Sequence, residues 1–174
     1  MATDAQARIR DLDRLRQDLL DRAGLLPEAA LRAKPPSGGW SILEIVEHLV
    51  LAERAILLDL PDPAALIDRP RGFKARCLYP LVLGILAWRV PVKVPSRRMQ
   101  PGGGCSLAEL RTRWDQTLAW LSAYAAGLDP ARPQPAVFLH PVAGPLTLDR
   151  ALRMALLHLE THRRQIQRLL AGRA

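Results

Sequence analysis

A long amphipathic segment near the C-terminus constrains the fold of this chain more than any other feature. Residues 146–170 read LTLDRALRMALLHLETHRRQIQRLL. Steps of three and four residues, typical of one helical face, connect Ala151, Ala155, His158, His162, Ile166 and Leu169. The two histidines therefore lie on the stripe that a helix would bury. Because rings four residues apart point the same way, they can hold one cation if another element supplies a third ligand.

A second predicted helix carries a third histidine. Ser41 and Glu44 have the spacing of a capping box, which predicts a helix start, and Pro61 ends the pattern. His48 lies one turn after Ile45, within or at the edge of the apolar stripe. Three of the four histidines thus lie on inward faces, where each imidazole needs a polar partner. A shared divalent cation would satisfy all three, and the alternative is a set of core histidines satisfied by hydrogen bonds.

Two further amphipathic segments complete the predicted fold. One begins with a capping box at Thr3 and ends at Gly24, and the other begins at Ser106 and ends near Gly127. No internal repeat and no convincing run of strands accompanies them. The pattern predicts an all-α four-helix bundle that forms a single domain over residues 1–174.

The connections between these helices differ in length. A loop after the first helix has room for one short helical turn at residues 28–33. Residues 62–104 predict a long crossover between helices 2 and 3, and their apolar part, residues 78–90, fits either a helix or an extended stretch. A proline-rich connection over residues 130–145 leads to the last helix, for which we expect Thr147 as the N-cap.

Composition restricts the partners. The formal net charge is +8, and the excess lies in residues 69–98, which hold eight basic residues and no acid. No nucleic-acid-binding motif accompanies this charge, so we do not expect a nucleic-acid-binding protein. The first residues lack the apolar core of a signal peptide, which predicts a cytoplasmic protein.

The longest apolar run, residues 77–88, predicts a buried segment or an interface patch and not a membrane span. It is interrupted by Pro80 and Gly84 and is too short to cross a bilayer. The apolar area of residues 78–88 exceeds what the end of a bundle needs, so we expect a homodimer. Cys77 and Cys105 lack the spacing of a redox or metal motif and are interpreted as structural thiols.

Three motifs resemble the DinB/YfiT-like family of small bacterial four-helix proteins. They read WSILEIVEHL at residues 40–49, FLHPVAGPLT at residues 138–147 and HLETHRRQI at residues 158–166. The resemblance covers most of the chain and implies a bundle with a divalent metal held by His48, His158 and His162. Zn²⁺ and Ni²⁺ both suit imidazole ligands, and ligand type does not choose between them.

The resemblance also implies a class of activity. Members of this family include thiol-dependent transferases and isomerases that use bacillithiol or mycothiol. We therefore expect a metal-dependent enzyme that transfers a low-molecular-weight thiol to a small-molecule electrophile. A metal-dependent hydrolase shares the same site and stays an alternative, as does a stress-associated metal-binding protein without catalysis.

Other polar residues have weaker claims to a functional role. Glu44 is a candidate catalytic base, although its spacing from Ser41 favours capping. His140 is expected to organise the turn before the last helix. The basic crossover offers candidates for holding an anionic cofactor, namely Arg71, Lys74, Arg76 and Arg97.

The remaining residues of the motifs are expected to have structural roles. Trp40 is expected to pack at the entrance of the second helix. Glu160 lies between the two C-terminal histidines in sequence and should point away from them into solvent. For Arg163 and Gln165 we expect packing and surface pairing before any contact with a substrate.

Overall fold

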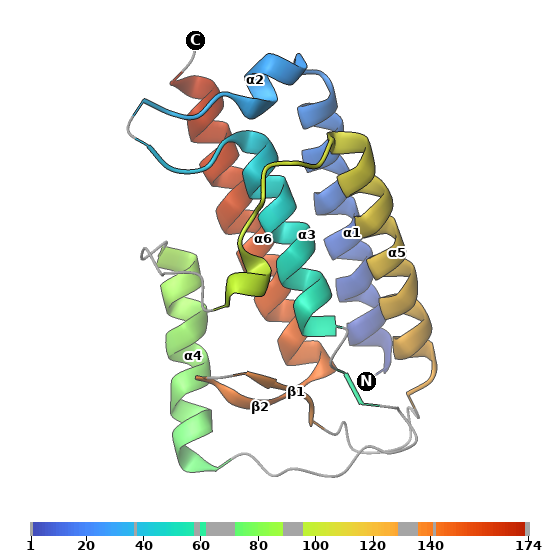
Figure 1. The fold of residues 1–174 in the computed structure, drawn as a ribbon. Helices are drawn as coiled ribbons and strands as arrows, with labels where there is room; N and C mark the ends of the chain where they lie inside the picture. The colour runs from blue at the N-terminus through green and yellow to red at the C-terminus, as the bar shows by residue number, and fades with distance from the viewer. Residues whose placement is uncertain are drawn as a thin grey trace.

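The computed structural model describes residues 2–36, 38–57, 60–61, 72–88, 96–128, 136–140 and 142–172. Its four long helices lie side by side as a bundle (Figure 1). They are α1 (Ala2–Gly24), α3 (Ile42–Leu57), α5 (Leu107–Ala126) and α6 (Leu148–Ala171). Helix α1 packs against α5 and α6, and α3 packs against the same two helices from the other side. The predicted all-α four-helix bundle is confirmed.

The inward faces of these helices form the main core. Its largest side chain is the indole of Trp114, which is fully buried. Leucine supplies most of the remaining volume, at Leu12, Leu20, Leu43, Leu49, Leu110, Leu121 and Leu159. Each such side chain contributes about 1.5–3 kcal/mol of burial free energy. The bundle is therefore held by apolar packing, and the polar residues on its inward faces need a separate explanation.

Local hydrogen bonds set the helix starts that the sequence predicts. The Ser41 hydroxyl accepts the Glu44 amide N–H, and the Glu44 carboxylate accepts the Ser41 N–H at 2.8 Å. Ser106 and Glu109 form the same reciprocal box before α5. Thr147 is the N-cap of α6, as expected. Helix α1 begins at Ala2, so the residue predicted to cap it lies within its first turn.

The crossover between α3 and α5 contains a fifth long helix. The apolar stretch that fitted either a helix or an extended strand is part of α4 (Phe73–Trp88), and it is followed by a 3₁₀ helix, η2 (Arg97–Met99). Helix α4 packs beside the bundle against α6 (Figure 1). Two hydrogen bonds join them: the Tyr79 hydroxyl donates to the Arg150 carbonyl, and the Thr161 hydroxyl to the Leu86 carbonyl. Tyr79 precedes Leu86 on α4, and its partner Arg150 precedes Thr161 on α6, so the two helices run parallel.

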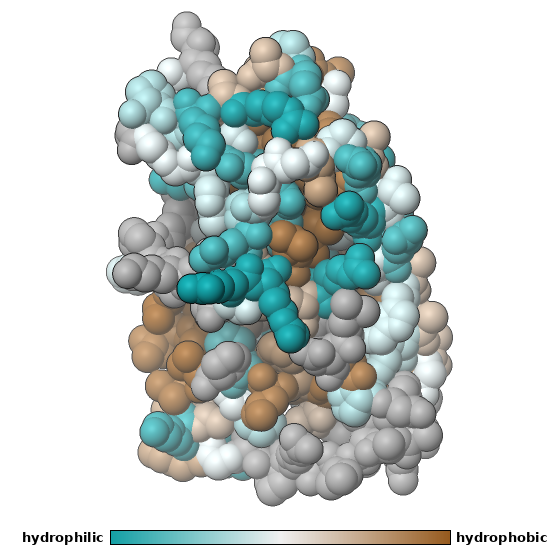
Figure 2. All heavy atoms as spheres, viewed as in Figure 1, coloured by the Kyte–Doolittle hydropathy of each residue, from teal (hydrophilic) through white to brown (hydrophobic). Residues whose placement is uncertain are grey.

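The outward face of α4 is apolar apart from Lys74 near its start. Phe73 and Trp88, at its two ends, are 84% and 86% exposed, and Leu81 between them is 56% exposed. Figure 2 shows hydrophobic side chains gathered over this part of the surface. In the part of the chain that the structure describes, no helix combines the length and apolarity needed to cross a bilayer.

A two-stranded hairpin precedes α6, where the sequence suggested only an irregular connection. Strands β1 (Ala136–His140) and β2 (Gly144–Thr147) pair antiparallel, with an irregularity between Ala136 and Phe138. The expectation of no strands was wrong here because both strands are short and their turn and second strand contain prolines, which weaken strand patterns. The short turn predicted after α1 is confirmed as α2 (Glu28–Arg32).

Candidate metal centre

Three imidazoles meet between α3 and α6. His48 comes from α3, and His158 and His162 come from consecutive turns of α6. The Nε2 atom of His158 lies 3.3 Å from Nε2 of His48 and 3.1 Å from Nε2 of His162. All three potential ligand atoms lie within 4.8 Å of one another. Ligand nitrogens around one Zn²⁺ at about 2.0–2.1 Å are separated by roughly 3.0–3.4 Å, so the spacing fits a shared cation.

Hydrogen bonds at the opposite ring nitrogens decide which atoms are free to bind. His48 Nδ1 lies 2.7 Å from the carbonyl oxygen of Met99, and His162 Nδ1 lies 2.8 Å from the amide oxygen of Gln165. Because these oxygens only accept hydrogen bonds, each Nδ1 carries the proton and each Nε2 has a lone pair. A proton on His158 Nε2 can form a hydrogen bond to only one of the two neighbouring Nε2 atoms at a time. A cation can bind all three nitrogens at once.

The surroundings keep these rings uncharged. Burial, reinforced by the neighbouring imidazoles, lowers the pKa of His158 to about 3. Burial and the neighbouring His48 lower the pKa of His162 to about 4, although its bond to Gln165 opposes the shift. Burial also lowers the pKa of His48, against the effect of its bond to Met99. Neutral imidazole is the form that binds metals, so the site is ready to bind at neutral pH.

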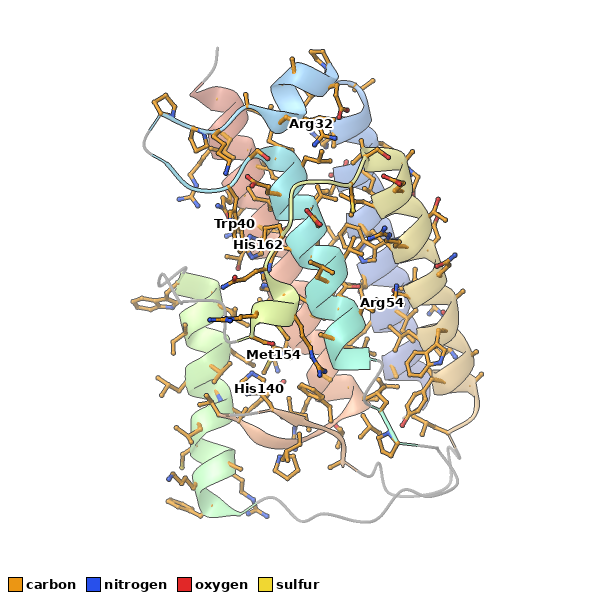
Figure 3. All side chains as sticks on the ribbon, viewed as in Figure 1. Arg32, Trp40, Arg54, His140, Met154 and His162 are labelled. Carbon is orange, nitrogen blue, oxygen red and sulfur yellow. The ribbon has the colours of Figure 1, made fainter. Side chains whose placement is uncertain are left out.

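The indole of Trp40 covers one side of the cluster. Its ring centroid lies 4.7 Å from that of His48 and 6.5 Å from that of His162. Figure 3 shows Trp40 and His162 next to each other, in front of α6. The sequence suggested only that Trp40 packs where α3 begins, whereas the structure also places it against two of the imidazoles. It shields them from water on that side.

A buried carboxylate ties the end of the crossover to α3. Glu47 is 7% exposed and accepts the Gly103 N–H at 2.8 Å and the Cys105 thiol at 3.7 Å. These contacts hold the chain that follows Met99 in place, and hence the carbonyl that orients His48. Sequence reasoning missed Glu47. The available signal was a second carboxylate in this helix, directly before His48 and flanked by apolar residues on its other side.

The other carboxylate candidate, Glu44, has a structural role. It caps α3 and forms an ion pair with Lys34 at 3.1 Å. Among the described residues, no Asp, Glu or Cys joins the three histidines as a possible ligand. Glu160 bonds to Arg163 and Arg164, as expected for a surface charge. A cation at this site would therefore be held by neutral donors alone.

The candidates for cofactor binding are dispersed. Arg97 is exposed on η2, two residues before Met99, and therefore lies near the histidines. Lys74 and Arg76 are exposed on α4, and Arg71 lies outside the described residues. Of the three candidates that the structure describes, Arg97 is the one on the segment that bonds to His48.

His140 stays outside the cluster. Its Nδ1 accepts the N–H groups of Val142 and Ala143, so it organises the hairpin turn as expected. Figure 3 shows it at the hairpin, beyond Met154 as seen from His162.

The fold and the site together define a class: a small helical bundle in which two helices supply three converging imidazoles. Residues 11–166 match the family model of the DinB superfamily, and the chain belongs to that superfamily. The fold is similar to that of TT2238, whose crystal structure is described as a four-helix bundle protein. The similarity has a TM-score of 0.54 at 23% identity and covers 97% of this chain and 99% of the other. None of the curated proteins compared matches the chain significantly.

Proposed function

We propose that His48, His158 and His162 bind one divalent cation, Zn²⁺ or Ni²⁺, and that the protein transfers a low-molecular-weight thiol to a small-molecule electrophile. The observation that carries this proposal is the convergence of the three Nε2 atoms, with spacings of 3.1 Å and 3.3 Å from His158. Two of the three rings have their Nδ1 atoms bonded to fixed acceptors, which orients the lone pairs toward one point.

The donor set supports a thiol as the nucleophile. When bound, a divalent cation would supply Lewis acidity and lower the pKa of a thiol from its usual value of about 8.5. Three neutral imidazoles leave the charge of the cation uncompensated, which favours an anionic partner. A hydrolase would use the same three imidazoles with water as the nucleophile. Metal-dependent hydrolysis therefore stays the alternative, and the activity assay distinguishes the two.

The chain's own residues have distinct roles in this proposal. The three histidines hold the cation, and Met99 and Gln165 fix the orientation of two of them. Trp40 excludes water from one side of the cluster. Arg97, exposed on η2, attracts an anionic thiol cofactor such as bacillithiol.

Metal analysis of protein purified without a histidine tag tests the first half of the proposal. We expect about one equivalent of Zn²⁺ or Ni²⁺ per chain, lost in His158→Ala. The matched control is His140→Asn, which changes the one histidine outside the cluster and keeps an acceptor for the turn. Wild-type protein without stoichiometric metal, or equal loss in both variants, would overturn the site.

An activity assay tests the second half. The metal-loaded protein is incubated with bacillithiol or mycothiol and an aryl halide, and the consumption of free thiol is followed. We expect turnover that disappears in His158→Ala. Hydrolysis of an ester in place of thiol consumption would favour the metal-dependent hydrolase. Metal binding without either activity would favour the non-catalytic, stress-associated protein.

We also propose a cytoplasmic homodimer that forms through the outward face of α4. The exposed Phe73, Leu81 and Trp88 give that face an apolar surface that a second copy can cover. Light scattering coupled to size exclusion should give the mass of a dimer for the wild type and of a monomer for Leu81→Glu. A wild-type monomer at all concentrations would contradict this proposal.

A further inference from the structure

A basic cavity lies between α4 and the start of α6. It has a volume of about 540 Å³ and is lined by Arg76, Tyr79, Arg150 and Arg153. Arg76 and Tyr79 are three residues apart on α4, and Arg150 and Arg153 have the same spacing on α6. Residues three apart share one side of a helix, so the two helices present their arginines to a common space.

Tyr79 connects the two helices that line this cavity. Its side chain is 8% exposed, and its hydroxyl donates to the Arg150 carbonyl at 3.2 Å. The guanidinium of Arg150 in turn lies 5.8 Å from the centroid of the Tyr79 ring. This cation–π contact holds one positive charge at the cavity wall.

No acidic side chain in the described part of the chain forms an ion pair with the arginines of the cavity. The ion pairs between described residues include neither Arg76 nor Arg150 nor Arg153. Farther along the same helix, Arg163 and Arg164 both pair with Glu160. Three guanidinium groups around one space repel one another, and a bound anion would remove that repulsion.

The cavity is separate from the histidine cluster. Arg153 and Arg150 precede His158 by five and eight residues on α6. These steps correspond to about 8 and 12 Å along the helix, and to rotations of about 140° and 80° around it. The arginines therefore face a different side of α6 from the imidazoles, and ligands at the two places do not compete for the same atoms.

We propose that this cavity is a binding site for the phosphate group of a small molecule. Guanidinium groups match phosphate oxygens with paired N–H donors, and three of them neutralise a dianion. A soluble phosphate compound and a phospholipid headgroup offer the same chemistry to these arginines. The two sources differ in whether the ligand binds from solution or only at a lipid surface.

Calorimetric titration with sodium pyrophosphate tests the soluble source. We expect saturable binding of one ligand per chain, weakened about tenfold in Arg76→Gln and in Arg153→Gln, because each removes charge-assisted hydrogen bonds. Both side chains are exposed, so neither variant should disturb folding. The matched control, Arg168→Gln, changes an exposed arginine fifteen residues beyond Arg153 on the same helix and should bind within about twofold of the wild type.

Co-sedimentation with phosphatidylglycerol vesicles tests the lipid source with the same variants. Vesicle binding without pyrophosphate binding, reduced in Arg153→Gln but not in Arg168→Gln, would support a headgroup as the ligand. Absence of binding in both experiments, or equal weakening in Arg168→Gln, would overturn the phosphate site. Metal content should be the same in all four proteins, so this proposal stands or falls independently of the histidine site.

Discussion

His48 Nδ1 donates a hydrogen bond of 2.7 Å to the carbonyl oxygen of Met99, which joins the inward face of α3 to the end of the crossover. The ring is thereby oriented by backbone and not by a side chain. His162 is oriented differently, by the amide of Gln165 within its own helix. The cluster thus depends on one contact that side-chain substitution can remove and one that it cannot.

Replacing Gln165 with Leu should weaken metal binding about 10- to 100-fold without removing a ligand. The variant loses the acceptor for His162 Nδ1, so the ring is free to rotate or to change tautomer. Competition with a chromogenic chelator measures the affinity. Gln167→Leu makes the same change at an exposed position of α6 and should leave the affinity unaltered. Equal affinities for the wild type and Gln165→Leu would contradict the orienting role.

Acid should destabilise the metal-free protein. The pKa values of His158 and His162 are about 3 and 4 in the folded chain, mainly because of burial, against 6.5 for an unperturbed histidine. The unfolded chain therefore takes up protons first, and stability present above pH 6.5 is lost as the pH falls toward 4. Between pH 6.5 and pH 5 we expect each of these histidines to lower the free energy of unfolding by roughly 1.5–2 kcal/mol.

Urea unfolding of the metal-free protein at both pH values measures this loss. His158→Gln should show a shallower pH dependence than the parent, because it removes one of the titrating rings. An unchanged dependence in this variant would contradict the assignment.

A second buried group has the opposite pH dependence. Glu53 is 5% exposed; its Oε2 accepts the Trp114 indole N–H at 2.7 Å, and its Oε1 has no hydrogen-bond partner within the described part of the chain. Burial raises the pKa of Glu53 to about 7, although the bond from Trp114 and the charge of Arg16 oppose the shift. Stability is therefore complete below the unfolded pKa of Glu53 and is lost as the pH rises through about 7.

Glu53→Gln should remove this loss, because an amide keeps the acceptor for Trp114 and carries no charge. At pH 8 we expect the variant to be more stable than the wild type by on the order of 2 kcal/mol, and at pH 5 the two should be similar. Urea unfolding at both pH values measures the difference. A variant less stable than the wild type at pH 8 would show that the carboxylate is required in its charged form. The pH dependence that the histidines cause is best measured in the Glu53→Gln variant, because Glu53 then no longer titrates.

Gly144→Ala should destabilise the packing of the hairpin on α4. Gly144 has φ +69°, and an added Cβ would lie 2.9 Å from the Cβ of Ala75. Gly38 has φ +79° with no heavy atom within 4 Å of such a Cβ, so Gly38→Ala is a control for backbone strain alone. We expect Gly38→Ala to lower the free energy of unfolding by about 1 kcal/mol and Gly144→Ala to lower it by about 2–3 kcal/mol, as measured by urea unfolding. Equal decreases in the free energy of unfolding for the two variants would mean that α4 shifts to accommodate the new methyl group at no cost in free energy.

The sequence predicted the bundle because its signals are local. Capping boxes and apolar stripes depend on residues three or four apart, and Ser41 and Ser106 begin their helices as predicted. Convergence of His48 with His158 and His162 was expected from their inward faces and from the family resemblance, and the structure places them together.

Apart from the histidine cluster, the sequence did not predict contacts between distant segments. Met99 orients His48 through its carbonyl, which any residue could supply, so no side-chain pattern marks it. The sequence predicts only local packing for Trp40, and its contact with His162 depends on how α6 lies against α3. The cavity lined by Arg150 and Arg153 likewise exists only because α4 runs alongside α6.

The separation of His48 from His158 along the chain, 110 residues, has a consequence for biosynthesis. A nascent polypeptide that has exposed α3 but not α6 offers one imidazole, and a single imidazole retains a divalent ion poorly. Loading of the proposed cation must therefore wait until α6 has left the ribosome and docked. The cation would then enter a bundle that leucine packing has already closed, so we expect it to bind after folding and not to nucleate it.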